Sequence, residues 1–284
     1  VAVMVLEAGG MPFIADSQYT TLPFTLSEID HAYGPNVHIL SNPVMMTLLA
    51  KVCAKETTQP EANRLFNELY IDLLKSVIDA EFPRRQVEVP SRMIAHTERG
   101  VYKGQALDPE VKVAVAAMMR AGILPSLVVF DRLNLLFDPA GIREDCFFVS
   151  RSTDSQHKVT GANVASSKIG GDLKDRILLL PDPMGATGSS ILQTLDTYRD
   201  AGAGQPAKMI AMHLIVTPEY LRYVTKNSPE LIVYAIRLDR GLSSPEVLAT
   251  KPGERWNEER GLTDIHYIVP GGGGIGEVMT NSWV

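Results

Sequence analysis

Apolar runs alternate along the chain with segments in which apolar residues recur every third or fourth position. Short apolar runs predict buried strands, and the helical spacing predicts amphipathic helices. We expect strands at 111–119, 147–149, 177–180, 208–216 and 231–238, after a short extended piece at 37–44. We expect helices at 45–54, 60–79, 126–137, 190–201 and 218–226. This alternation is typical of an α/β fold with a doubly wound, mainly parallel sheet.

The helix expected at 60–79 has the clearest pattern. An apolar residue recurs at every fourth position of it, at Leu65, Leu69, Leu73 and Val77. Thr58 and Glu61 have the spacing of a capping box, which predicts where the helix begins. The apolar stripe predicts a face that packs in the core or against another subunit.

Four segments interrupt the alternation. Residues 1–36 mix short apolar runs with Gly and Pro, so we expect an N-terminal extension there and a single domain over 37–284. Residues 81–108 are mainly polar, with an edge strand at 87–90 as a candidate element. Residues 159–175 are small and polar, which is typical of a flexible arm or lid. Residues 240–263 predict a loop or a short helical insert.

Composition narrows the class of protein. The 27 basic and 33 acidic residues leave a formal net charge of −6 without blocks of like charge, so neither nucleic acid nor an anionic membrane is indicated as a partner. No apolar run approaches the ~20 residues that cross a bilayer, and the apolar start at 1–6 is too short for a signal peptide. Cys53 and Cys146 lie far apart, and neither they nor the histidines have metal-ligand spacing. We therefore expect a cytoplasmic protein.

Residues 177–191 carry the strongest chemical signal. Four apolar residues, typical of a buried strand, run into Asp182 and then into a small-residue turn before a helix. Glycine and alanine in the turn let the backbone approach an anion, while hydroxyls and the first helical amides can donate to its oxygens. Asp182 would lie at the carboxyl end of the strand, where α/β sheets bind ligands, and a carboxylate there suits sugar hydroxyls. The pattern predicts a phosphate site and matches neither the Walker loop nor the dinucleotide fingerprint.

The same stretch resembles the phosphoribosyl pyrophosphate (PRPP) loop of type I phosphoribosyltransferases, in the version found in the uracil phosphoribosyltransferase family. In that version a proline replaces a second acid. The matching residues are Asp182, Pro183, Met184, Gly185, Ala186, Thr187, Gly188, Ser189 and Ser190. The alternative, an ordinary strand followed by a capped helix, explains the apolar run but leaves the hydroxyl-rich turn unexplained.

Further segments resemble the same family in the same order along the chain. They are His38 to Pro43, the Met119-Arg120-Ala121-Gly122 turn, the Ser150-Arg151-Ser152 arm and the Tyr267-Ile268-Val269-Pro270-Gly271-Gly272-Gly273 loop. The resemblance spans about residues 37–284. It implies that Arg120, with Ala121 and Gly122, and Arg151 face pyrophosphate. It also implies that the backbone of the last loop, at Tyr267, Ile268, Val269, Gly271, Gly272 and Gly273, reads the edge of a base.

The resemblance also implies a reaction. PRPP would bind as its magnesium complex, with the 5′-phosphate on Ala186 to Ser190, the ribose hydroxyls at Asp182 and pyrophosphate between Arg120 and Arg151. Guanidinium groups stabilise the charge that grows on leaving pyrophosphate, so Asp182, Arg120 and Arg151 are the candidate catalytic residues. The other substrate would be uracil or another pyrimidine-like base, in pyrimidine salvage. A homodimer or larger homo-oligomer is implied as well.

The last loop departs from the family pattern. Gly274 stands where the family has its first Asp, Glu277 where it has the second, and Val278 where it has an Arg. These changes leave the base and the position of magnesium open. Three hypotheses follow: a uracil phosphoribosyltransferase, a related enzyme for an unusual base, and a catalytically weak paralogue that senses PRPP or a nucleotide.

Overall fold

The chain folds around one mainly parallel sheet. The computed structural model describes residues 16–153 and 159–282. Its large sheet has the strand order β1-β10-β9-β7-β4-β5-β6, with β8 paired to β9, and β5–β6 is its antiparallel pair. The strands are β1 Val37–Ile39, β4 Lys112–Met119, β5 Ile142–Thr153, β6 Val159–Lys168, β7 Arg176–Pro181, β8 Met184–Gly185, β9 Lys208–Val216 and β10 Leu231–Leu238. The predicted fold class is confirmed.

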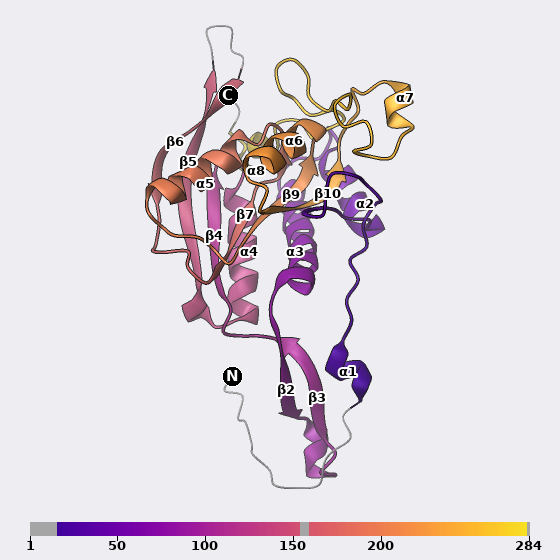
Figure 1. Cartoon of the computed structure of the whole chain (residues 1–284), viewed down its shortest axis with the longest axis vertical. Helices are drawn as coiled ribbons and strands as arrows, with labels where there is room; N and C mark the ends of the chain where they lie inside the picture. Colours follow the sequence, from indigo (N-terminus) through magenta and orange to yellow (C-terminus); the bar gives the residue numbers. More distant parts are fainter. Residues whose placement is uncertain (1–15, 154–158, 283–284) are drawn as a thin grey trace.

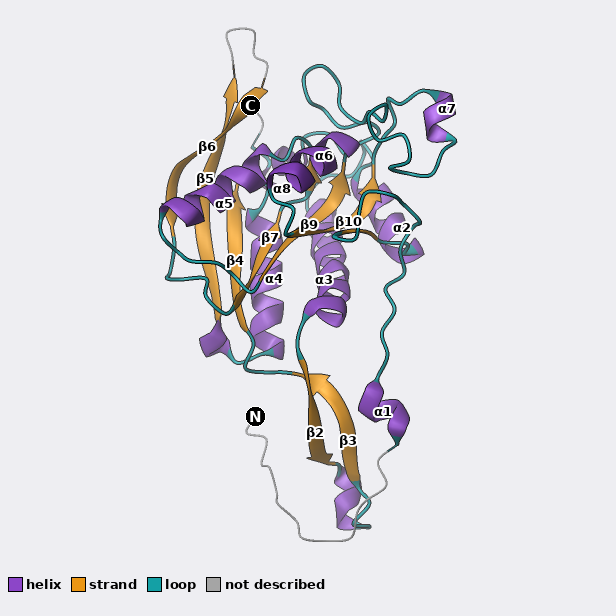
Figure 2. Cartoon of the chain, viewed as in Figure 1, coloured by secondary structure: helices purple, strands orange, loops and turns teal. Residues whose placement is uncertain are grey.

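Helices cover both faces of this sheet (Figure 2). One face packs against α2 Pro43–Val52, α3 Glu61–Glu81 and α4 Ile123–Leu136. The other packs against α5 Ser189–Asp200 and α6 Pro218–Asn227. Strand residues alternate between the two cores, because Leu179 belongs to the first while Leu178 and Leu180 belong to the second. Among the described residues, no helix is long and apolar enough to cross a bilayer.

The long helix α3 is central to the first core. Its residues Leu69, Leu73 and Val77 are fully buried within the chain, so the stripe packs in the core, as one of the two interpretations predicted. The predicted capping box is wrong. The N-cap is Pro60, without a side-chain cap hydrogen bond, and Thr58 lies outside the helix, where its carbonyl accepts the Ala62 N–H at 2.9 Å.

Two other boundaries differ from the sequence prediction. Helix α4 begins at Ile123 rather than at 126, because Pro125 falls in its first turn, where no intrahelical donor is lost. Strand β5 runs from Ile142 to Thr153 rather than over 147–149 alone. Its additional residues include polar ones such as Arg143, which pair with β4 in the sheet although they break the apolar run.

The predicted arm is a β-hairpin at the edge of the sheet. Residues 159–168, expected as part of a flexible arm, form β6 against β5 (Figure 1). The tip of the hairpin, residues 154–158, lies outside the described part of the chain. The side chains of residues 150–162 lie outside it too, so the mobility of the arm stays a prediction.

A second hairpin projects from the body of the molecule (Figure 1). It consists of β2 Arg84–Pro90 and β3 Val101–Leu107, with the 3-10 turn Arg92–Ala95 between them. The candidate edge strand at 87–90 is confirmed and longer, whereas β3 was not predicted because it lacks a clear apolar alternation. The short helix α1 Ser17–Thr21 lies beside it, and Gln86 Nε2 donates to Thr20 O at 2.7 Å. The boundary at residue 36 stays a prediction.

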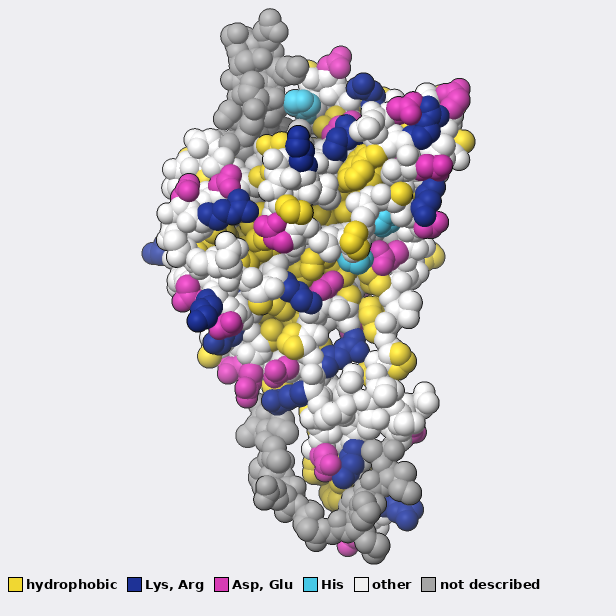
Figure 3. Space-filling view, viewed as in Figure 1, with side chains coloured by type: hydrophobic (Ala, Val, Ile, Leu, Met, Phe, Trp, Pro, Cys, Tyr) yellow, Lys and Arg dark blue, Asp and Glu magenta, His cyan; other side chains and the backbone are white. Residues whose placement is uncertain are grey.

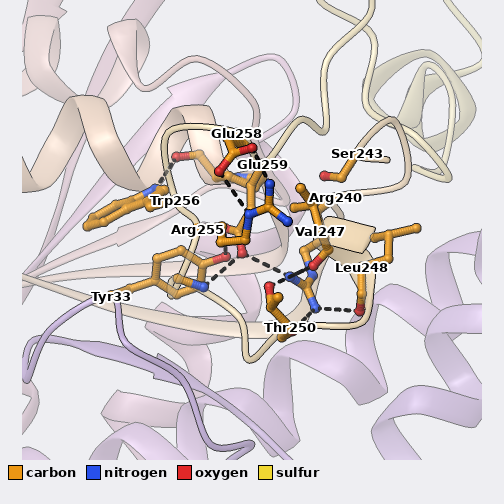
Figure 4. A network of polar contacts seen from close by, with 12 residues as sticks. Tyr33, Arg240, Ser243, Val247, Leu248, Thr250, Arg255, Trp256, Glu258 and Glu259 are labelled. Carbon is orange, nitrogen blue, oxygen red and sulfur yellow. Dashed lines mark hydrogen bonds and ion pairs between the residues drawn. The ribbon is translucent and has the colours of Figure 1, made fainter. Parts of the chain in front are cut away.

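The segment 240–263 is irregular, as predicted, and contains the short helix α7 Pro245–Leu248. A buried carboxylate organises it (Figure 4). Glu259, 1% exposed, accepts hydrogen bonds from the Tyr33 hydroxyl, from Arg240 Nη1 at 2.9 Å and from Gly253 N at 2.9 Å. Arg240 in turn donates to the carbonyl of Thr250 at 2.9 Å. The network ties this segment to the chain just before β1.

We predict that Glu259→Ala destabilises the protein by about 3–5 kcal/mol, because it leaves the Arg240 guanidinium buried without its counter-ion. Urea unfolding measures the change. The neighbouring Glu258→Ala is the matched control, because Glu258 is exposed and forms an ion pair with Arg255 at the surface. Equal midpoints for the two variants would contradict the role given to Glu259.

Candidate active site

A cavity of about 470 Å³ lies outside the carboxyl ends of β4 and β7. Three segments that are distant in the sequence line it. They are the turn after β4 at 118–121, the loop and helix start at 182–191, and the C-terminal segment at 266–277. Val149 from β5 and Tyr220 from α6 complete the lining. The carboxyl ends of parallel strands are where α/β sheets bind ligands.

The phosphate loop of the cavity is held from behind by β9 and α6. Thr217 Oγ1 donates to Ala186 O at 2.7 Å, and Thr217 N donates to Gly185 O at 3.1 Å. Gly188 has φ +86°, and a Cβ there would lie 2.8 Å from Val224 Cγ1. Glycine is therefore required at 188 by both conformation and space.

Helix α5 begins directly after this turn, and no side chain caps its N-terminus. The first amides of the helix are thus available for anion oxygens, and the helix dipole favours negative charge there. Thr187 Oγ1 and Ser189 Oγ lie 3.0 Å apart at the same end. This arrangement can bind a phosphate group.

Asp182 begins the loop and its backbone is fixed on both sides. Its N–H donates to Met212 O at 3.1 Å, and its carbonyl accepts from His213 Nδ1 at 2.6 Å. His213 Nε2 lies 2.6 Å from the Tyr220 hydroxyl. Because a carbonyl can only accept, the His213 proton is on Nδ1, and Nε2 accepts from Tyr220. Burial lowers the pKa of His213 to about 4, so this chain of hydrogen bonds is neutral at pH 7.

The turn after β4 presents an arginine to the cavity. The Met119–Arg120 peptide bond is cis, and Gly122 N donates to Met118 O at 2.8 Å. Arg120 is exposed, and its Nη1 donates to Ser282 Oγ at 2.9 Å. A guanidinium at the cavity edge that is held only by Ser282 among the described residues can exchange this contact for an anionic ligand.

The second predicted arginine, Arg151, lies in β5 opposite Ala162. Its side chain is outside the described part of the chain. The pairing of Arg120 and Arg151 around pyrophosphate therefore stays a prediction.

The loop predicted to read the base is fixed by a buried ion pair beneath it. Arg237 Nε donates to Asp239 Oδ1 at 2.6 Å, and Asp239 is 1% exposed. Gly271 N donates to Asp239 Oδ2 at 2.7 Å, and Gly271 O accepts from Arg237 Nη2 at 2.9 Å. Gly271 and Gly273 have φ +62° and +68°, which favours glycine at both.

The cavity brings together most of the predicted site residues. Those that line it are Arg120, Ala121, Asp182, Met184, Ala186, Thr187, Gly188, Ser189, Ser190, Tyr267, Ile268 and Gly273. Those that do not are Gly122, Pro183, Gly185, Val269, Gly271 and Gly272. The glycines of the second group shape the turns, since a Cβ at Gly122 would lie 2.5 Å from Met118 O and one at Gly271 2.2 Å from Ile268 O.

Several lining residues were not predicted as site residues. Tyr220 lies at the start of α6 and reaches the cavity only through the fold. His266 has φ +63°, and its buried Nδ1 has no hydrogen-bond partner among the described residues. Ile275 and Glu277 come from α8 Ile275–Thr280, a helix that the glycine-rich sequence did not indicate.

Comparisons with known proteins agree with this geometry. A family model described as uracil phosphoribosyltransferase matches residues 39–254. The uracil phosphoribosyltransferase of Shouchella clausii is 25% identical over 250 residues, which cover 85% of this chain and 96% of that protein. The one from Caldanaerobacter subterraneus is 26% identical over 242 residues, with the same coverage. Among solved structures, the AQ2163 protein from Aquifex aeolicus has a TM-score of 0.63 at 20% identity, over 87% of this chain and 99% of that one, and so shares the fold.

We predict a specific pH dependence from His213. Its pKa is 6.5 when unfolded and about 4 in the native protein, so the unfolded state binds a proton first as the pH falls. The stability contribution is fully present above pH 6.5 and is lost between pH 6.5 and 4, by about 3 kcal/mol in total.

Urea unfolding of the parent and of His213→Gln across this range isolates the effect, because the other titrating groups are common to both proteins. The parent should lose more stability than the variant. If the free energy of unfolding falls equally with pH in both proteins, His213 is not held neutral.

Proposed function

The chain belongs to the uracil phosphoribosyltransferase family, and we propose that it transfers the phosphoribosyl group of PRPP to uracil or a related heterocyclic base. Family membership makes the protein a pentosyltransferase. The observation that carries the proposal is the single cavity in which the phosphate loop, the Arg120 turn and the Tyr267 loop meet. The phosphate loop suits the 5′-phosphate, the Arg120 turn suits pyrophosphate, and the Tyr267 loop suits the base.

We propose that the residues act mainly by positioning and by electrostatics. The 5′-phosphate binds at the uncapped start of α5, and Asp182 accepts hydrogen bonds from the ribose hydroxyls. The C1′–O bond breaks with its electron pair leaving on pyrophosphate. The new bond joins C1′ to a ring nitrogen of the base, which gives up its proton to solvent. Arg120 and Arg151 stabilise the charge that develops on pyrophosphate.

We propose that PRPP arrives as its magnesium complex. Asp182 and Glu277 are the carboxylates that line the cavity, and carboxylate oxygen is a donor that Mg²⁺ prefers. Among the described residues, no group of three His, Cys, Asp or Glu side chains could hold a metal by itself. The remaining ligands would then come from PRPP and water.

We further propose a cytoplasmic enzyme of pyrimidine salvage. The two free cysteines, Cys53 and Cys146, are consistent with a reducing compartment. Side chains of both charge signs are interspersed over the face shown in Figure 3, so charge does not favour nucleic acid as a partner. The alternative of a catalytically weak sensor is less well supported, because the phosphate loop and Arg120 keep their places in the cavity.

We also propose a homodimer or larger homo-oligomer. The apolar face of α3 is buried within the chain, so the interface must lie elsewhere. The projecting hairpin exposes Val89, Met93, Ile94 and Tyr102. Since a two-stranded hairpin is at best marginally stable by itself in water, we propose this apolar surface as the interface.

Sedimentation velocity tests the oligomer. We expect the mass of a dimer or larger assembly for the parent, and a shift to monomer for Ile94→Asp. Leu135→Asp is the control, because Leu135 is 72% exposed on α4 and is not part of the hairpin. A parent that is monomeric at every concentration would reject the proposal.

We predict that Asp182→Asn lowers kcat/KM for PRPP about 10- to 100-fold, because it removes a charged acceptor for the ribose hydroxyls. The assay is pyrophosphate release from PRPP and magnesium, with uracil and a panel of other bases. Asp196→Asn on the exposed side of α5 is the control. Unchanged PRPP kinetics in Asp182→Asn would contradict the proposal that Asp182 binds the ribose. In the parent, the base that makes pyrophosphate release possible is the second substrate.

A further inference from the structure

The Glu277 side chain folds back over Gly274. A Cβ built on Gly274 would lie 1.7 Å from Glu277 Oε2 and 2.7 Å from Glu277 Cδ. Both residues line the cavity. The carboxylate of Glu277 therefore fills the space that a side chain at 274 would need.

The backbone does not require glycine at 274. Its φ of −78° lies in a region that other residues adopt, unlike the positive φ of Gly271 and Gly273. The three atoms nearest to the Cβ position all belong to Glu277. In this arrangement a side chain at 274 would displace the Glu277 carboxylate, which is the end of a flexible side chain.

The carboxylate lies where the pyrophosphate turn and the base loop meet. The start of α8 packs on the turn, since a Cβ at Gly276 would lie 3.4 Å from Ala121 Cβ. On its other side Gly274 follows directly on Gly273 of the base loop. In the proposed reaction C1′ must stand between base and pyrophosphate. Glu277 thus lies between the two segments that the proposed reaction places on either side of the reacting carbon.

Glu277 lies in the first turn of α8, where the helix dipole favours a negative charge, but no side chain in the described part of the chain holds its carboxylate. It forms no ion pair and accepts no hydrogen bond there, and α8 has no side-chain cap bond. By contrast, Asp239 and Glu259 nearby are each held by an arginine and by a backbone N–H. A carboxylate without a protein partner at the edge of a cavity is suited to a charged group of the ligand.

We propose that Glu277 stabilises positive charge at the reacting centre, and that glycine at 274 leaves room for its carboxylate in this position. This inference rests on the proposed phosphoribosyl transfer. A carboxylate can stabilise positive charge from either of two sources. One is the ribosyl carbon, which becomes cationic as pyrophosphate leaves, and the other is the divalent cation that accompanies PRPP. The ribosyl carbon is more positive in the transition state than in the ground state, so a carboxylate that stabilises this charge raises kcat.

Reciprocal substitution tests the proposal. Glu277→Gln keeps the shape and removes the charge, and we expect kcat to fall at least 10-fold. Gly274→Asp alone should also lose activity, because two carboxylates compete for one space. The double variant Gly274→Asp/Glu277→Ala frees that space for the new carboxylate, and we expect at least 10-fold recovery over Glu277→Ala. Asp175→Asn, an exposed acid in the turn before β7, is the control for a lost charge.

The magnesium dependence separates the two sources of charge. If the carboxylate acts on the divalent cation, Glu277→Gln needs more magnesium for half-maximal rate. If it acts on the ribosyl carbon, kcat falls while the magnesium dependence and the KM for PRPP stay near the parent values. Parental kcat in Glu277→Gln, or a double variant no better than Glu277→Ala, overturns the proposal.

Stability measurements keep this inference distinct from the proposed function. Gly274→Asp should destabilise the parent in urea but not the Glu277→Ala background, and equal effects in both would reject the shared space. A parent that releases no pyrophosphate with any base would reject the transfer reaction and the charge role together. Urea unfolding would then still test whether the side chains at 274 and 277 compete for the same space.

Discussion

The buried hydrogen-bond chain from Tyr220 through His213 to the backbone of Asp182 is the contact on which the site depends. It joins α6, β9 and the end of β7 at the point where the phosphate loop leaves the sheet. Tyr220 also packs beneath the loop, since a Cβ at Gly185 would lie 3.2 Å from its ring. A neutral imidazole satisfies one acceptor and one donor without burying a charge, which a cationic side chain in the same place could not do. The loop is thus held in position before any ligand arrives, which lowers the cost of ordering it on binding.

The two regions of the cavity that we propose for the substrates are supported in different ways. The phosphate loop follows a central strand directly and is fixed by neighbouring strands and helices. The base loop lies some distance along the chain from β10 and is fixed by the Arg237–Asp239 pair, through the backbone of Gly271. Because backbone atoms make these bonds, the side chains of the loop can change without loss of its course.

The sequence allowed prediction of those features that depend on neighbours along the chain. The phosphate loop was found because strand, acid, turn and helix start are contiguous, and the buried strands because both their faces are apolar. The capping box at Thr58 failed because spacing alone does not show where the first helical residue lies. Tyr220 was missed because only tertiary packing brings it to the cavity. His266 and Glu277 adjoin the predicted base loop in the sequence but were not interpreted as site residues. Strand β3 was missed because it is half exposed and pairs outside the main sheet, where apolar alternation is weak.

The contact between Tyr33 and Glu259 joins residues 226 positions apart, and β10 is the strand beside which β1 lies in the sheet. During synthesis, the first strand of the sheet must therefore wait until nearly the whole chain has left the ribosome. The central strands β4, β5 and β7 have their partners much sooner and can pair without it. Residues 29–40, with their apolar side chains, would stay exposed for most of translation, and this end of the nascent chain is the part most in need of a chaperone.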